Sequence, residues 1–184
     1  MDDAFNWSII DSRNCRNAPV VRHDCPYLKE ADRRDMNCGG YALGTLDWYC
    51  PDSYYDREDL DFWDDSQCFY DNCNSPEYYH FCDKLAEIYV DNMLNDPHSN
   101  VIREVDNPYV ALESDERIVA FRASAEDFHY IRQMSDGSWS HKQGGLAIEE
   151  FPEEALDSFV WEGDCELYSG RTHYLVVKDN TLVA

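Results

Sequence analysis

The chain has 184 residues, of which 43% are hydrophobic and 14% aromatic, so it has enough apolar material to build the core of one folded domain. Its 15 basic and 38 acidic residues give a formal net charge of −23, which repels nucleic-acid phosphates and anionic lipid surfaces. We therefore expect neither a nucleic-acid partner nor a membrane partner.

Residues 1–36 mix charged residues, Asn and Pro with few periodic apolar positions, which predicts an irregular N-terminal arm. The opening residues MDDAFNWSIIDSRN lack the basic and apolar regions of a signal peptide, and no apolar run approaches the roughly 18 residues of a membrane span. We expect a single domain over residues 1–184 and a cytoplasmic location by default. The eight cysteines leave non-classical export or delivery by another route as an alternative.

Two helices are predicted in the first half of the chain. The stretch NCGGYALGTLDWY, residues 37–49, spaces its apolar residues as on one face of a helix, with Asn37 as N-cap and Pro51 as terminator. Residues 51–75 are rich in Asp, Glu and aromatic residues without a clear period, which indicates an acidic insertion. A Ser75-Pro76-Glu77 start then predicts a second helix that runs to about Leu94.

The second half of the chain is rich in β-forming runs. They cover residues 101–105, 117–123, 128–134, 138–142 and 173–178, and a short helix is predicted at 152–159. Helices followed by strands favour an α+β fold, with N-terminal helices packed on a C-terminal antiparallel sheet.

The sequence around Cys38 suits a reactive thiol. Cys38 stands at the start of the first predicted helix, where the partial positive charge of the helix end favours the thiolate. Gly39 and Gly40 remove side-chain bulk where a substrate backbone would approach. The alternative interpretation is an ordinary buried cysteine followed by a tight turn.

His129 and His141 flank a predicted hairpin in the stretch HYIRQMSDGSWSH. An imidazole on a sheet can act as general base toward a thiol, and a second imidazole can fix the tautomer of the first. The alternative is a pair of sheet histidines with no chemical role.

Taken together, NCGGYAL at residues 37–43 and the histidine hairpin at 128–142 resemble the papain-like cysteine hydrolases of the NlpC type. The resemblance implies a papain-like fold with Cys38 as nucleophile, His129 as base and His141 as orienting residue. It also implies that Tyr27 contributes to the oxyanion hole, that no cofactor is needed and that the substrate is a peptide or peptidoglycan-type amide. Acyl transfer to an acceptor other than water uses the same residues and stays open.

The predicted hairpin leaves the contact between the two histidines undecided. A two-residue turn at Asp136-Gly137 places His141 opposite Arg132, on the other sheet face from His129. A three-residue loop over 136–138 places His141 opposite Gln133, on the same face but roughly 13 Å away. Contact then needs a bulge, a strong twist or a wider turn, and without it Gln133, Asp127 or a residue of 173–178 could take the orienting role.

Three other interpretations compete with the enzymatic one. Cys68, Cys73, His80 and Cys82 invite a zinc site, but their spacing does not match the common structural pairings, so we expect no metal. Disulfides within the Cys15/Cys25 and Cys68/Cys73/Cys82 clusters are the alternative in an oxidising compartment. The charge of −23 also suits a non-enzymatic acidic interaction protein, which would act as a decoy or dock a basic protein partner at residues 54–71.

Overall fold

The computed structural model of this chain describes residues 36–45, 48–51, 75–97, 99–124, 127–134, 136–143, 146–152, 156, 161 and 168–178. Nearly all of the predicted N-terminal arm, acidic insertion and short helix at 152–159 lies outside them, and so does Tyr27.

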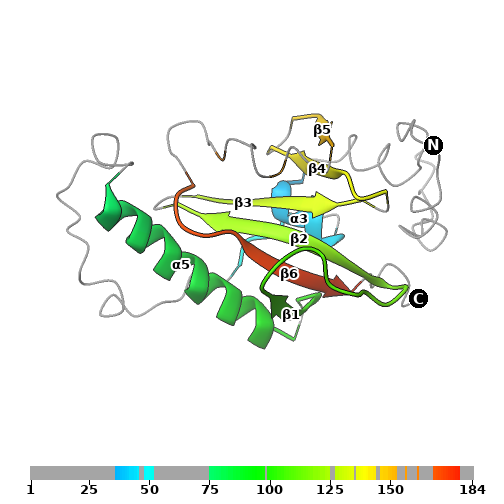
Figure 1. Ribbon diagram of the computed structural model, residues 1–184, viewed down its shortest axis with the longest axis horizontal. Helices are drawn as coiled ribbons and strands as arrows, with labels where there is room; N and C mark the ends of the chain where they lie inside the picture. Colours follow the sequence, from blue (N-terminus) through cyan, green and yellow to red (C-terminus); the bar gives the residue numbers. More distant parts are fainter. Residues whose placement is uncertain are drawn as a thin grey trace, which may run out of the picture.

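The described residues form a six-stranded sheet in which all strand pairs are antiparallel. The strands are β1 (Val101–Val105), β2 (Glu116–Ala123), β3 (Phe128–Gln133), β4 (Trp139–Lys142), β5 (Ile148–Phe151) and β6 (His173–Lys178). Their spatial order is β1-β6-β2-β3-β4-β5, so β2 to β5 form a meander and β6 returns between β1 and β2 (Figure 1). The predicted α+β class and C-terminal antiparallel sheet are confirmed, while β5 was not predicted.

Two helices are described, α3 (Cys38–Leu43) and α5 (Pro76–Asn95). The predicted Ser75 cap of α5 is confirmed, because its side chain accepts a hydrogen bond from the N–H of Tyr78. The prediction for α3 was too long. Gly44 adopts the left-handed conformation, with φ of 75°, and its N–H bonds to Tyr41, which ends the helix well before Tyr49. Neither described helix is long and apolar enough to cross a lipid bilayer.

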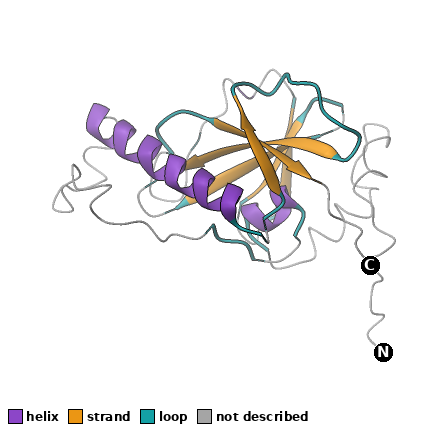
Figure 2. Cartoon of the chain, turned by 90° about the horizontal axis from the view of Figure 1, so that it is seen from below, coloured by secondary structure: helices purple, strands orange, loops and turns teal. Residues whose placement is uncertain are grey.

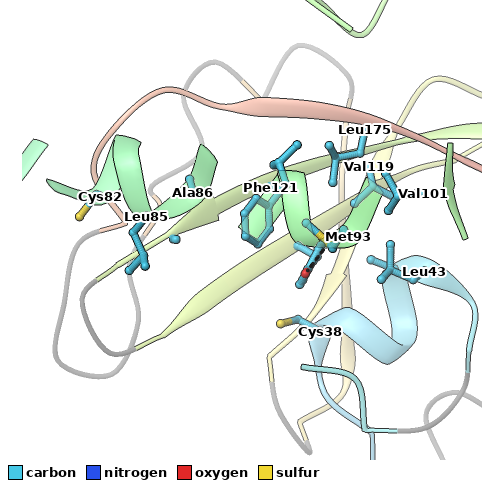
Figure 3. Packing of buried hydrophobic residues seen from close by; sticks show 14 of the residues in the cluster. Cys38, Leu43, Cys82, Leu85, Ala86, Met93, Val101, Val119, Phe121 and Leu175 are labelled. Carbon is cyan, nitrogen blue, oxygen red and sulfur yellow. Dashed lines mark hydrogen bonds between the residues drawn. The ribbon is translucent and has the colours of Figure 1, made fainter. Parts of the chain in front are cut away.

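Both helices pack on one face of the sheet (Figure 2). Figure 3 shows this core, in which Leu43 of α3 and Met93 of α5 approach strand residues such as Val119 and Phe121. Alternate strand residues face the other way and form a second core with Leu156, Trp161 and Tyr168. Because both faces are covered, strand residues on either face are buried, and each large apolar side chain adds about 1.5–3 kcal/mol to stability.

Candidate active site

Asn37 fixes the start of α3 through three hydrogen bonds. Its side-chain oxygen accepts from the N–H groups of Gly40 and Tyr49, each at 3.0 Å, and its amide donates to the Tyr49 carbonyl oxygen at 2.6 Å. Residue 49 lies so close to the start of α3 that a Cβ added at Gly39 would lie 2.9 Å from the Tyr49 carbonyl oxygen. The Asn37-Cys38-Gly39 sequence therefore holds the first turn of the helix against residue 49.

The Cys38 thiol lies against β3. It donates to the carbonyl oxygen of Phe128 at a distance of 3.6 Å, it is 6% exposed and it takes part in no disulfide. Figure 3 shows the sulfur projecting from the first turn of α3.

Strand pairing places this thiol at one edge of β3. The N–H of Ser124 donates to the carbonyl oxygen of Asp127 at 2.7 Å, and the β2–β3 register continues that pair. In an antiparallel ladder the backbone groups alternate in direction, so those of Phe128 and Tyr130 point away from β2 and toward β4. The β3–β4 pairing begins only at Arg132, opposite Ser140. The thiol therefore lies where β3 and β4 separate, beside the backbone of residue 129.

Burial keeps the Cys38 thiol protonated. It raises the pKa of the thiol to about 12, a shift that hydrogen bonding from the N–H of Tyr130 reduces and the nearby Asp127 carboxylate increases. The N–H groups of Gly39 and of Cys38 itself, at the start of α3, also favour the thiolate, but less than burial disfavours it. The predicted thiolate is thus wrong for this conformation, because the helix-end amides are outweighed by desolvation.

The two histidines are in direct contact. Nε2 of His129 lies 2.8 Å from Nδ1 of His141, and the ring planes are nearly perpendicular, at 89°. Nε2 of His141 in turn lies 3.3 Å from a carboxylate oxygen of Glu149.

The turn between β3 and β4 explains this contact. The N–H of Met134 donates to the carbonyl oxygen of Ser138 at 2.7 Å, and Gly137 takes a φ of 88°. Both predicted turns begin at Asp136, one residue later than the observed strand register requires. The observed register pairs Gln133 with Trp139, which places His141 level with Ile131 and only two residues along the same sheet face from His129.

Aromatic rings enclose His129. The Tyr168 ring stacks on it at 5.8 Å between centroids, and the Trp161 ring meets it edge-on at 6.2 Å. Burial lowers the pKa of His129 to about 3, with the charge of a protonated His141 adding to the shift. Burial also lowers the pKa of His141, and the hydrogen bond to Glu149 opposes that shift. Both imidazoles are therefore neutral at neutral pH.

The thiol and the His129 imidazole do not touch. Phe128 and Tyr130 belong to the core under the helices, whereas His129 points to the opposite face with Trp161 and Tyr168. No hydrogen bond within the described part of the chain joins Cys38 to either imidazole. The prediction that the sulfur contacts the His129 imidazole directly is therefore wrong for this structure. Successive side chains of β3 point to opposite faces of the sheet, so the His129 ring points away from Cys38. The thiol nevertheless lies beside the backbone of His129.

Only two of the four candidate zinc ligands lie among the described residues. On α5, His80 is exposed and Cys82 buried, so the two point to different sides as predicted, while Cys68 and Cys73 lie outside the described residues. Among the residues that the structure describes, no group of three or more could hold a metal ion.

Glu149 was missed because the sequence did not predict β5, the strand that places it opposite His141.

Searches of protein-family models, of curated proteins and of solved structures find no match for this chain. A functional assignment therefore depends on the arrangement of the chain's own residues.

Proposed function

We propose that the chain is a cysteine hydrolase of papain-like fold that cleaves an amide bond of a peptide or peptidoglycan-type substrate. Cys38 is the nucleophile, His129 the general base and His141 the orienting residue. One observation carries the proposal. The Nε2 atom of His129 is held by His141 at 2.8 Å, while the thiol lies beside the backbone of the same strand position. Nδ1 is the His129 ring nitrogen that His141 does not engage, and we propose that it is the atom that accepts the thiol proton.

The proposed acyl chemistry starts from a neutral thiol, and it requires substrate binding to raise the pKa of His129 and lower that of Cys38 from their buried values. As the sulfur attacks the carbonyl carbon, Nδ1 of His129 accepts the thiol proton, and the carbonyl oxygen becomes an oxyanion. The N–H groups of Cys38 and Gly39, which favour the thiolate form of Cys38, can donate to that oxyanion. The imidazolium returns its proton to the departing amine, and water then hydrolyses the thioester to release the acid and the free thiol. An amine or hydroxyl acceptor in place of water would make the same site an acyltransferase.

The mechanism requires the ring and the sulfur to approach each other across the edge of β3. Paired residues hold β4 to β3 from Arg132 onward, opposite Ser140, and the thiol lies before that point. The approach therefore requires the His129 ring to leave its place beside Tyr168 and Trp161 and to pass the edge of β3 that precedes those pairs. In the unliganded protein burial keeps both groups neutral, and in this mechanism the proton moves only when substrate brings them together.

The test uses p-nitrophenyl acetate, a small activated acyl donor, and locates the acetyl group by mass spectrometry. We expect acetylation at Cys38, its loss in Cys38→Ser and a decrease of about 100-fold or more in His129→Ala. The exposed Cys50 provides the matched control, so Cys50→Ser should keep the wild-type rate. Acetylation confined to other cysteines, or an undiminished rate at Cys38 in a folded His129→Ala protein, would refute the proposal.

A second candidate is the non-enzymatic acidic interaction protein. The buried, protonated state of Cys38 favours it, because a structural thiol needs no activation, and the net charge of −23 supplies the attraction for a basic partner. This candidate predicts no acetylation at Cys38. It also predicts salt-sensitive binding to a basic probe such as polylysine that is equal for wild type and Cys38→Ser.

A further inference from the structure

Glu149 extends the contact between the two histidines into a chain of three side chains. The β4–β5 register places Glu149 directly opposite His141, and the carboxylate lies 3.3 Å from Nε2 of that ring. The Glu149 side chain is 77% exposed, whereas that of His141 is 8% exposed. The chain therefore runs from solvent at Glu149, through His141, to the enclosed ring of His129.

The hydrogen positions on the two histidine rings follow from the chemistry of Glu149, which lies at the solvent-exposed end of this row of three side chains. An ionised carboxylate only accepts hydrogen bonds, so Nε2 of His141 must carry a hydrogen in order to bond to Glu149. A neutral imidazole carries one N–H hydrogen, which leaves Nδ1 of His141 as an acceptor. The 2.8 Å contact then requires Nε2 of His129 to be the donor. The remaining ring nitrogen of His129, Nδ1, is left with a free lone pair.

Two neutral imidazoles alone would not fix this direction. With His129 and His141 isolated from other groups, either ring can be the donor, and in one of the two arrangements Nδ1 of His129 carries the hydrogen. A base with a hydrogen on that atom cannot accept a proton from the thiol. The group at the outer end of the chain therefore decides which arrangement is populated.

We propose that Glu149 is a positioning residue that fixes the tautomers of both histidines and thereby leaves the lone pair on Nδ1 of His129. The catalytic consequence depends on the proposed function, because it matters only if His129 is the base toward Cys38. The tautomers themselves do not depend on it. They follow from the hydrogen-bonded chain and can be measured without any substrate.

The first experiment measures ring tautomers in ¹⁵N-labelled full-length protein by ¹⁵N–¹H correlation spectroscopy at neutral pH. Signals are assigned with His129→Gln and His141→Gln. We expect both rings to carry hydrogen on Nε2 in the wild type. Glu149→Gln introduces an amide that can donate to His141, so the Nδ1–H form of His129 should become populated. Glu150, the exposed neighbour that pairs with Ser140, gives the matched control, and Glu150→Gln should match the wild type. An Nδ1–H form of His129 in the wild type, or unchanged tautomers in Glu149→Gln, would overturn the proposal.

The second experiment measures acetylation of Cys38 by p-nitrophenyl acetate in the same proteins. We expect Glu149→Gln to slow it by about 10-fold or more, Glu149→Asp to restore part of the rate, and Glu150→Gln to leave it unchanged. A wild-type rate in Glu149→Gln would contradict a positioning role. If the wild type shows no acetylation at Cys38, the proposed function fails, while the tautomer measurement still decides the role of Glu149.

Discussion

Replacing Gly39 by alanine tests how tightly the start of α3 is held. The added Cβ would lie 2.9 Å from the Tyr49 carbonyl oxygen and 3.2 Å from the Tyr130 ring, so a neighbour must move. The carbonyl oxygen cannot turn aside freely, because the Asn37 side chain bonds to both the C=O and the N–H of Tyr49. The methyl group therefore strains the hydrogen bonds that hold the thiol-bearing turn in place.

Two opposing effects decide whether Gly39→Ala stabilises or destabilises the protein. In an unobstructed helix, alanine is better than glycine by about 1 kcal/mol. Overpacking costs about 1–3 kcal/mol, and a lost hydrogen bond costs about 1 kcal/mol more. We expect the obstruction to outweigh the helix preference, with a net loss of about 1–3 kcal/mol and a Tm lower by roughly 2–4 °C for each kcal/mol.

Urea unfolding followed by circular dichroism gives the free energy difference, and an unchanged slope with a lower midpoint would identify a stability effect. In Asn37→Ala the Tyr49 carbonyl is released, so adding Gly39→Ala to that background should cost about 1 kcal/mol less than in the wild type. If Gly39→Ala is as stable as the wild type or more stable, helix preference has prevailed and the described contact is wrong.

Two further predictions follow from buried titratable groups. The pKa of the Cys38 thiol, raised to about 12 by burial, predicts that the ultraviolet difference between wild type and Cys38→Ser shows no thiolate band below about pH 10, and a band at pH 7 would contradict it. The pKa of His129, lowered to about 3, means that between pH 6.5 and 3 the unfolded chain binds a proton that the folded chain does not, so stability falls as the pH falls. His129→Gln should reduce the slope of unfolding free energy against pH in this range by about 1.4 kcal/mol per pH unit, and an unchanged slope would show that His129 titrates normally.

The sequence predicted elements whose signals are local. The Ser75-Pro76 start located the beginning of α5, and β-rich runs located β1, β2, β3, β4 and β6 to within one residue at each end. The end of α3 was missed because apolar spacing continues to Tyr49, while the left-handed Gly44 stops the helix earlier. The strand β5, with the sequence IEEF, carries two acidic residues and is held by pairing with β4, which composition does not reveal.

The candidate site was predicted as a set of residues but not as a geometry. The turn that brings His141 beside His129 differs by one residue from either predicted turn, and such a difference changes which partners face each other. The face on which His129 lies depends on how β3 sits over α3, a contact between segments 90 residues apart in sequence. The state of the thiol depends on burial, which the cap residues around Cys38 do not encode.

The most direct test of the central claim is a crystal structure of the protein with an acyl or peptidyl inhibitor bound covalently at Cys38. The account predicts that Nδ1 of His129 then lies within hydrogen-bond reach of the sulfur or of the group that leaves it, with Nε2 still held by His141. An imidazole that remains on the opposite sheet face, out of reach of the occupied sulfur, would contradict a catalytic pair of Cys38 and His129.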